Sequence, residues 1–276
     1  MKLLVTTDFS ENSKGAIRFA HTLAKQSKGI EVVFYHAVHL LKPTRWTDVF
    51  YSEYKADEIG RLTIDLKKFV YAAISKKKNK FKSVQFIIDA AKSTEKDIII
   101  YAENNNFDYI CIATQGAGML RKIIGTHTSY IVNNSSIPVM VVPSHYRTKP
   151  IKRAVYLSDF ENLKKEIKIV TAVSAVTKLK LEVLHYSSLV ADAKKIKNNK
   201  ALFSSDKYKK IKLNIVQTNL DLSLIERVSK FIKKSKPELL ILFTSQERSF
   251  FESIFLPSKS SELTYSTKVP VLIFPK

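Results

Sequence analysis

The sequence contains the same pattern of apolar segments twice, about 150 residues apart. Each copy begins with an apolar run that ends in Asp-Phe, continues with a run that ends in histidine, and closes with a run containing X-Pro-Val. Along the chain these segments are LLVTTDF (3–9), VVFYH (32–36) and IPVMVVP (137–143), then VYLSDF (155–160), LEVLH (181–185) and VPVLIFP (269–275). This period is far too long for a solenoid repeat, so each copy is expected to be a domain.

The length of 276 residues suits two domains of ordinary size, predicted here as residues 1–146 and 147–276. They are joined by a polar stretch bounded by Pro143 and Pro150. The longest apolar runs have strand length, so no membrane span and no membrane partner are expected, and the start of the chain has no secretory pattern. The single cysteine, Cys111, lies in an apolar run, which indicates a buried thiol in a protein of the reducing cytoplasm.

Strand-like and helical patterns alternate in both copies. Strands are predicted at 2–7, 30–38, 84–88, 109–113 and 139–142, and again at 153–157, 180–185, 213–217, 239–243 and 271–274. Helical periodicity lies between them, with Ser10, Asn12, Ser13 and Thr94 as candidate caps. The stretch 197–211 looks irregular. This alternation predicts two tandem doubly wound α/β domains, each with a parallel sheet and helices on both faces.

The net charge of +21 is spread over both copies and does not form a basic arm. Such an excess can attract nucleic acid, nucleotides or anionic lipid. The lysine runs have no interleaved aromatic residues that could stack on bases. We therefore interpret most of the excess as solvated helix faces, and a nucleic-acid partner is not expected.

In open α/β sheets, ligands bind beyond the carboxyl ends of the strands. In the first copy this edge carries Thr6, Thr7 and Asp8, then 37–38, then 113–118. Asp8 could accept hydrogen bonds from a sugar hydroxyl or hold a metal, or it could cap the following helix. The two glycines within 113–118 give the backbone of that segment conformational freedom. The stretch 125–129 (GTHTS) begins a helix, and a helix N-terminus favours anions.

These segments resemble the universal stress protein family in its tandem two-domain form. The resemblance is carried by VTTDFSENSKGAIRFA, FYHAV and ATQGAG…GTHTSYIV…IPVMVVP, and it extends over almost the entire chain. It implies five-stranded parallel sheets in the order 3-2-1-4-5, like those of adenine nucleotide alpha hydrolases. It also implies that the closing strands 139–142 and 271–274 pair as an intrachain pseudo-dimer. Many members bind ATP through Gly, two residues, Gly, nine residues, then Gly-Ser or Gly-Thr.

Carried over to this sequence, the resemblance implies an adenine-nucleotide site in the first domain only, for ATP or a related nucleotide with or without magnesium. Asp8 would approach the ribose or adenine, beside Thr6 and Thr7, and the Val38 backbone would meet adenine. The loop and the helix start would hold the phosphates, through Ala113, Gly116, Gly125, Thr126, His127, Thr128 and Ser129.

The sequence departs from the family pattern in both copies. In the first, Ala113 replaces the first glycine, and Gly116 and Gly125 enclose eight residues where the pattern has nine. In the second, Phe243-Thr244-Ser245-Gln246 contains no glycine and Pro257 removes an N–H donor. We therefore expect no triphosphate site in the second copy, where Asp159 would act as a cap or loop anchor.

The resemblance implies a stress-response regulator or interaction module, with slow ATP hydrolysis at most. The alternatives are a nucleotide-free scaffold in which both sites have decayed and, on charge alone, a nucleic-acid-associated protein. His36 and His185 occupy equivalent positions, which indicates a shared structural role. No catalytic residue or metal-ligand spacing stands out. The protein partner is not readable from the sequence, and a homodimer beyond the pseudo-dimer stays open.

Overall fold

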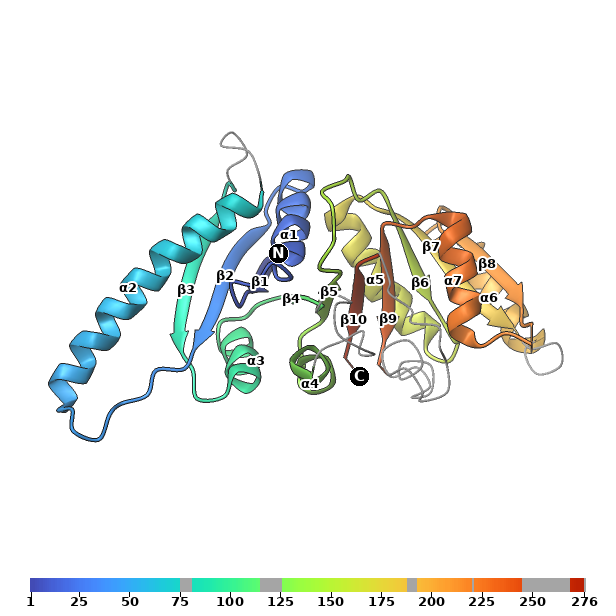
Figure 1. Cartoon of the computed structure of the whole chain (residues 1–276). Coiled ribbons are helices and arrows are strands. Elements are labelled where there is room, and N and C mark those ends of the chain that lie inside the picture. Colours follow the sequence, from blue (N-terminus) through green and yellow to red (C-terminus); the bar gives the residue numbers. More distant parts are fainter. Residues whose placement is uncertain (75–80, 115–125, 188–192, 220, 245–268, 276) are drawn as a thin grey trace. The chain divides into compact units, whose positions relative to one another are not determined.

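The structure is a computed structural model that describes residues 1–74, 81–114, 126–187, 193–219, 221–244 and 269–275. These residues form two compact units, of which unit 1 ends at Thr148 and unit 2 begins at Lys149 (Figure 1).

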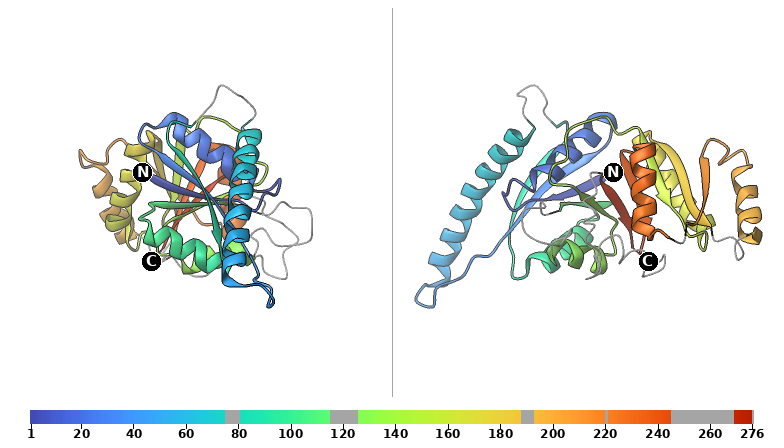
Figure 2. Two further views of the ribbon diagram at one scale, coloured as in Figure 1. Left: turned by 90° about the vertical axis from the view of Figure 1, so that its left-hand side faces the viewer. Right: turned by 45° about the vertical axis from the view of Figure 1, so that its right-hand side comes forward.

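The described strands of unit 1 form a parallel sheet in the order β3-β2-β1-β4-β5. Helices cover both faces: α1 packs with α2, and α3 packs with α4 (Figures 1 and 2). The elements are β1 (Lys2–Thr6), α1 (Lys14–Gln26), β2 (Glu31–Val38), α2 (Asp48–Ala73), β3 (Val84–Ala90), α3 (Thr94–Asn104), β4 (Tyr109–Ala113), α4 (Thr126–Asn134) and β5 (Val139–Val142).

Unit 2 repeats this topology, with the parallel order β8-β7-β6-β9-β10. Its elements are β6 (Arg153–Leu157), α5 (Leu163–Thr177), β7 (Lys180–Ser187), α6 (Ala193–Phe203), β8 (Lys212–Gln217), α7 (Leu224–Ser235), β9 (Leu239–Phe243) and β10 (Val271–Phe274). The predicted fold class, two tandem parallel sheets in the order 3-2-1-4-5, is confirmed. The expectation of irregular structure from residue 197 is wrong, because α6 continues to Phe203.

Several strands are buried along all or nearly all of their length, as is typical of parallel strands in doubly wound sheets. In β1, the four residues after Lys2 are buried, and every residue of β5, β9 and β10 is buried. One face of α1 is also buried, including Ala16, Phe19, Ala20 and Leu23, whose spacing follows the helical period. Burial of these side chains supplies most of the free energy that holds each helix to its sheet.

The predicted helix caps are only partly correct. Thr94 is the first residue of α3, and Ser93 occupies the cap position. The carboxylate of Asp97 accepts hydrogen bonds from the backbone N–H groups of Lys92 and Ser93, at 2.7 and 2.9 Å. Ser13 occupies the cap position of α1, but its hydroxyl donates to the Ser10 carbonyl at 2.8 Å and does not cap the helix.

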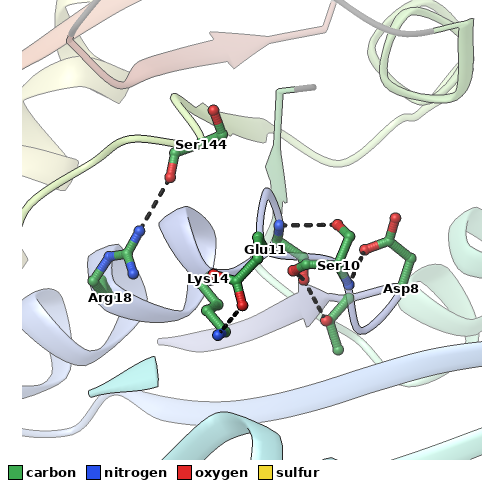
Figure 3. Close-up of polar contacts among 8 residues, drawn as sticks. Asp8, Ser10, Glu11, Lys14, Arg18 and Ser144 are labelled. Carbon is green, nitrogen blue, oxygen red and sulfur yellow. Dashed lines mark hydrogen bonds and ion pairs between the residues drawn. The ribbon is translucent and has the colours of Figure 1, made fainter. Parts of the chain in front are cut away.

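The chain that leaves β5 is held closely against α1. A Cβ atom added to Gly15 would lie 2.4 Å from the carbonyl oxygen of Pro143 and 2.9 Å from that of Ser144. One turn further along α1, the guanidinium of Arg18 donates to the carbonyl oxygens of Tyr146 and Ser144, at 2.7 and 3.1 Å; Figure 3 shows the contact with Ser144. Glycine is therefore required at position 15 for this close approach of two backbones.

Gly15→Ala is expected to lower the free energy of unfolding by about 1–3 kcal/mol, because the added methyl group meets backbone oxygens that cannot move independently. Gly60→Ala in α2 is the matched control: no heavy atom lies within 4 Å of its added Cβ, and the change should stabilise by about 0.5–1 kcal/mol. Urea denaturation followed by the fluorescence of Trp46, the single tryptophan, reports on unit 1. If Gly15→Ala unfolded at the same midpoint urea concentration as wild type, this result would contradict the close packing.

Candidate functional site

A cavity of about 530 Å³ lies in unit 1 at the carboxyl ends of β1, β2 and β4. This volume falls within the range of roughly 300–1,000 Å³ that small-molecule pockets occupy. The lining comes from those strand ends, from the turn before α1 and from the first turns of α3 and α4. It consists of Thr6, Thr7, Asp8, Ser10, Asn12, Ser13, Tyr35, His36, Ala37, Thr94, Glu95, Ile98, Ile112, Ala113, Thr114, His127, Thr128 and Ile131.

The structure brings many of the predicted site residues together around this cavity. Those that line it are Thr6, Thr7, Asp8, Ala113, His127 and Thr128. Val38 and Ser129 are not among the lining residues, and the Val38 carbonyl accepts a hydrogen bond from the Ala91 N–H at 2.9 Å. Thr126 is the first residue of α4, while Gly116 and Gly125 lie outside the described residues.

The chain makes a tight corner between β1 and α1. Thr7 Oγ1 accepts a hydrogen bond from the Phe9 N–H at 3.2 Å. Asp8 Oδ1 accepts one from the Ser10 N–H at 3.0 Å, and Figure 3 shows this second contact. Phe9 has a φ of 60°, in the left-handed region that non-glycine residues rarely adopt. The two side-chain acceptors satisfy backbone donors that this turn leaves without sheet or helix partners.

The Asp8 carboxylate is stabilised in its charged form. Partial burial raises the pKa of this carboxyl, but hydrogen bonds from the side chain and backbone of Ser10 act in the opposite direction and outweigh burial, so the pKa lies below its ordinary value of 3.8. Of the two sequence-based interpretations of Asp8, the structure shows local stabilisation of the turn that precedes α1. It also leaves the side chain exposed at the cavity, where the carboxylate can reach a ligand.

His36 fastens the end of β2 to this corner. Its Nδ1 lies 2.8 Å from the Thr7 carbonyl oxygen, and because a carbonyl oxygen only accepts, Nδ1 carries the proton. The Phe9 ring packs edge-on against the imidazole, with centroids 4.6 Å apart, and against Phe69 of α2 at 5.5 Å. His36 therefore holds together two strand ends that line the cavity.

Unit 2 contains the same corner, with the same kinds of contact. Ser158 Oγ accepts from the Phe160 N–H at 3.1 Å, and Asp159 Oδ1 accepts from the Glu161 N–H at 3.0 Å. His185 Nδ1 lies 2.9 Å from the Ser158 carbonyl oxygen, and Phe160 has a φ of 68°. The predicted structural role shared by the two histidines is confirmed, as is the role of Asp159 as a loop anchor.

The corners differ in how the histidine meets the aromatic ring. In unit 2 the rings of Phe160 and His185 stack with centroids 3.7 Å apart, and His185 is buried, with 4% exposure. In unit 1 the corresponding pair is edge-to-face, and His36 lines the cavity. The His36 imidazole thus borders the cavity of unit 1, whereas the His185 imidazole is buried.

Sequence reasoning missed one charged residue of the site, Glu95. It lies in the first turn of α3, where its carboxylate pairs with Nδ1 of His127 at the start of α4. The side chains of Glu95 and His127 are 24% and 59% exposed, and both line the cavity. The sequence feature that could have identified Glu95 is its position shortly after β3, at the same edge of the sheet as Asp8.

The other chemistry-bearing groups of the described residues give no further candidate centre. Cys111 is fully buried, and burial raises the pKa of its thiol, so the predicted structural thiol is confirmed. Within the described ranges, no group of three or more His, Cys, Asp or Glu side chains could hold a metal ion. Nor does any described helix have the length and apolarity needed to cross a membrane.

These features define a tandem, doubly wound α/β protein with a cavity at the carboxyl edge of its first sheet. The sequence model of the universal stress protein family matches residues 1–143, which is more than half of the chain. The chain therefore belongs to the universal stress protein family.

Two solved structures share the fold along almost the whole chain. A universal stress protein from Archaeoglobus fulgidus DSM 4304 is 16% identical, with a TM-score of 0.68 over 99% of this chain and 98% of that chain. A functionally unknown protein from Pseudomonas aeruginosa PAO1 is 12% identical, with a TM-score of 0.56 over 99% and 92%. Comparison with curated protein sequences gave no match. At these identities the likeness concerns the fold alone.

The depressed pKa of Asp8 predicts a pH-dependent contribution to stability. A carboxyl whose pKa is lower in the folded state stabilises the fold above its unfolded value, and this contribution is lost as the pH falls through the folded value. Asp8→Asn should therefore be less stable than wild type at neutral pH, and the difference should shrink on acidification below about pH 4. Urea denaturation between neutral and acidic pH measures it, with Asp57→Asn on the exposed side of α2 as control. A difference that is independent of pH would contradict the assignment.

Proposed function

We propose that unit 1 binds ATP or a related adenine nucleotide in its cavity. The observation that carries this proposal is the convergence of β1, β2, β4 and the start of α4 on one cavity of ligand size. The position is the one at which doubly wound sheets hold nucleotides, and a helix N-terminus offers free N–H groups to a phosphate. Membership of the universal stress protein family supports the same ligand class.

The lining offers complementary groups for both ends of such a ligand. The exposed Asp8 carboxylate can accept hydrogen bonds from sugar hydroxyls, and the neighbouring Asn12 amide can donate or accept. Thr128 is 97% buried from solvent in the first turn of α4 and faces the cavity, so its hydroxyl can donate to a phosphate oxygen. In the sequence, Gly125 immediately precedes this turn.

We propose that the chain is a cytoplasmic stress-response regulator or interaction module and that it is not a fast enzyme. The described lining offers no nucleophile that is paired with a base, as rapid hydrolysis would require. Nucleotide occupancy would act by shifting the population of conformers that a protein partner recognises, which requires different affinities for the two conformers. We do not assign that partner.

We further propose that unit 2 has no triphosphate site. Residues 245–268, which would form the phosphate-binding segment, lie outside the described residues. Two features support the proposal: Pro257 cannot donate a backbone hydrogen bond, and His185 is buried under the Phe160 ring.

The second candidate function is a nucleotide-free scaffold. One observation favours it: the described lining of the cavity contains two carboxylates, Asp8 and Glu95, and no lysine or arginine. A polyphosphate would meet like charge at this surface without a compensating cation among the described residues.

The amount of nucleotide that co-purifies with the protein separates the two functions. Mass spectrometry of the small molecules released by denaturation is expected to give about one adenine nucleotide per chain. Two per chain would overturn the proposal for unit 2. No nucleotide, together with no heat of binding when ATP and magnesium are added, would favour the scaffold.

The site is tested by Thr128→Val, which removes one hydroxyl at nearly constant volume. If Thr128 contacts the nucleotide, the dissociation constant measured by calorimetry should rise about tenfold, because one hydrogen bond to a charged group is lost. Thr22→Val is the matched control, since Thr22 is equally buried in α1 but does not line the cavity. Equal affinity of Thr128→Val and wild type would exclude the proposed phosphate position.

A further inference from the structure

We propose that the amino edge of the sheet in unit 2 binds the sugar–phosphate backbone of a nucleic-acid duplex, without regard to base sequence. The proposal goes beyond the nucleotide binding proposed for unit 1, because it concerns the other unit and uses other residues. The concentration of lysine at the starts of β6, β7 and β8 and at the ends of α5, α6 and α7 carries it.

Basic residues stand at the starts of three neighbouring strands. The strands of unit 2 are parallel, so their first residues lie along one edge of the sheet. Lys152 immediately precedes β6, and the first residues of β6, β7 and β8 are Arg153, Lys180 and Lys212. Arg153 and Lys180 are direct partners in the register, and the Lys180 N–H donates to the Lys152 carbonyl oxygen at 2.8 Å. These four residues therefore form one basic row.

The segment between α6 and β8 adds three lysines to this row. A helix that connects two parallel strands ends at the edge where the next strand begins. Lys207, Lys209 and Lys210 lie between the end of α6 and the start of β8, and all three are exposed. Tyr208, which lies among them, is buried. The segment thus turns its aromatic ring inward and its cations toward solvent.

The ends of α5 and α7 bring further lysines to the same edge. Lys178 follows α5 directly, and Lys236 follows α7. The guanidinium of Arg153 donates to the Lys236 carbonyl oxygen at 2.8 Å, which holds the end of α7 against the start of β6. Exposed Lys233 and Lys234 lie in the last turn of α7. A helix C-terminus favours cations by itself, but this effect does not extend to the lysines at the strand starts.

The positive charge of unit 2 is concentrated at this edge. The basic edge consists of the segments 152–153, 178–182, 206–212 and 233–238. It contains eleven of the 24 basic residues in 151–276 but only three of the 12 acidic ones. Residues 245–268, which lie outside the described residues, contain three of each sign and contribute no net charge. The sequence-based interpretation of the lysines as solvated helix faces therefore does not account for this concentration.

The three acidic residues of the basic edge do not neutralise it. Asp206 pairs with Lys209 at 2.7 Å, and Glu182 lies 3.9 Å from Lys212. Glu238 accepts a hydrogen bond from the first backbone N–H of β6 at 2.9 Å. If each acid cancelled one cation, eight of the eleven would remain. Such a surface attracts a polyanion.

The apolar residues of the basic edge decide between polyanions. Phe203 and Tyr208 are buried, so their rings cannot stack on the bases of a single strand. Leu179, between two exposed lysines, is also buried and cannot insert into a membrane surface. Contacts to the backbone of a duplex need only cations, and a duplex presents one phosphate for about every 1.7 Å of its axis. A duplex therefore fits the basic edge best.

The test is fluorescence anisotropy of a labelled DNA duplex of about 20 base pairs, titrated with the full chain at several salt concentrations. The dissociation constant is expected to rise with salt, with a slope of at least about 4 in a double-logarithmic plot, because counterions are released from the phosphates. A second duplex of unrelated sequence should bind with the same affinity, since phosphate contacts carry no sequence information.

The combined variant Lys180→Gln, Lys210→Gln and Lys234→Gln removes three exposed charges, one each from β7, the segment after α6, and α7. It should weaken duplex binding at least about tenfold at 0.1 M salt and lower the slope by about 2–3, because each lost phosphate contact removes about 0.9 from the slope.

The matched control is the combined variant Lys164→Gln, Lys165→Gln and Lys168→Gln. It removes the same number of exposed charges from the first half of α5, away from the basic edge. The control should weaken duplex binding less than about threefold, since these lysines do not contact the phosphates. Urea denaturation of both variants, with wild-type midpoints expected, shows that the substitutions leave the fold intact.

Three results would overturn the proposal. One is that neither duplex binds at low salt, and another is that the control variant weakens binding as much as the variant of the basic edge does. The third is tighter binding to phosphatidylserine vesicles than to the duplex, with the same dependence on Lys180, Lys210 and Lys234, which would assign the basic edge to a membrane. The nucleotide binding proposed for unit 1 stands or falls separately in each case.

Discussion

The parallel direction of the strands is the constraint from which the rest of each unit follows. Parallel neighbours need long crossovers, and the crossovers that the structure describes contain helices that pack against the sheets. The same direction brings the carboxyl ends of β1, β2 and β4 to one edge, where residues far apart in sequence become neighbours. The cavity is thus a consequence of topology, and the side chains that line it decide what it can hold.

The sequence predicts the fold well because strands buried on both faces appear as uninterrupted apolar runs. β9 (LLILF) and β10 (VLIF) are visible in this way, and their bounds match the structure. The second half of helix α6 (AKKIKNNKALF) could not be recognised as helical, because its few apolar residues give little periodicity.

Some residues of the site could be predicted from the sequence, and others could not. Thr6, Thr7, Asp8 and Ala113 could be predicted because chain order alone places them at strand ends. Glu95 could not be assigned, because its role depends on how the first turns of two helices come together in space. Val38 ends a strand as expected, but it does not line the cavity, and its carbonyl is bonded to Ala91 beyond the adjacent strand β3.

The corner after the first strand of each unit has a consequence for comparing related proteins. Both copies retain a left-handed phenylalanine, an aspartate that accepts from the backbone two residues on, and a histidine bound to a carbonyl oxygen. Each part satisfies groups of the protein itself, so folding alone is sufficient to preserve it. An Asp-Phe pair followed by a strand-end histidine is therefore a marker of ancestry and architecture, and relatives that share it can have lost or exchanged their ligands without leaving a trace in this motif.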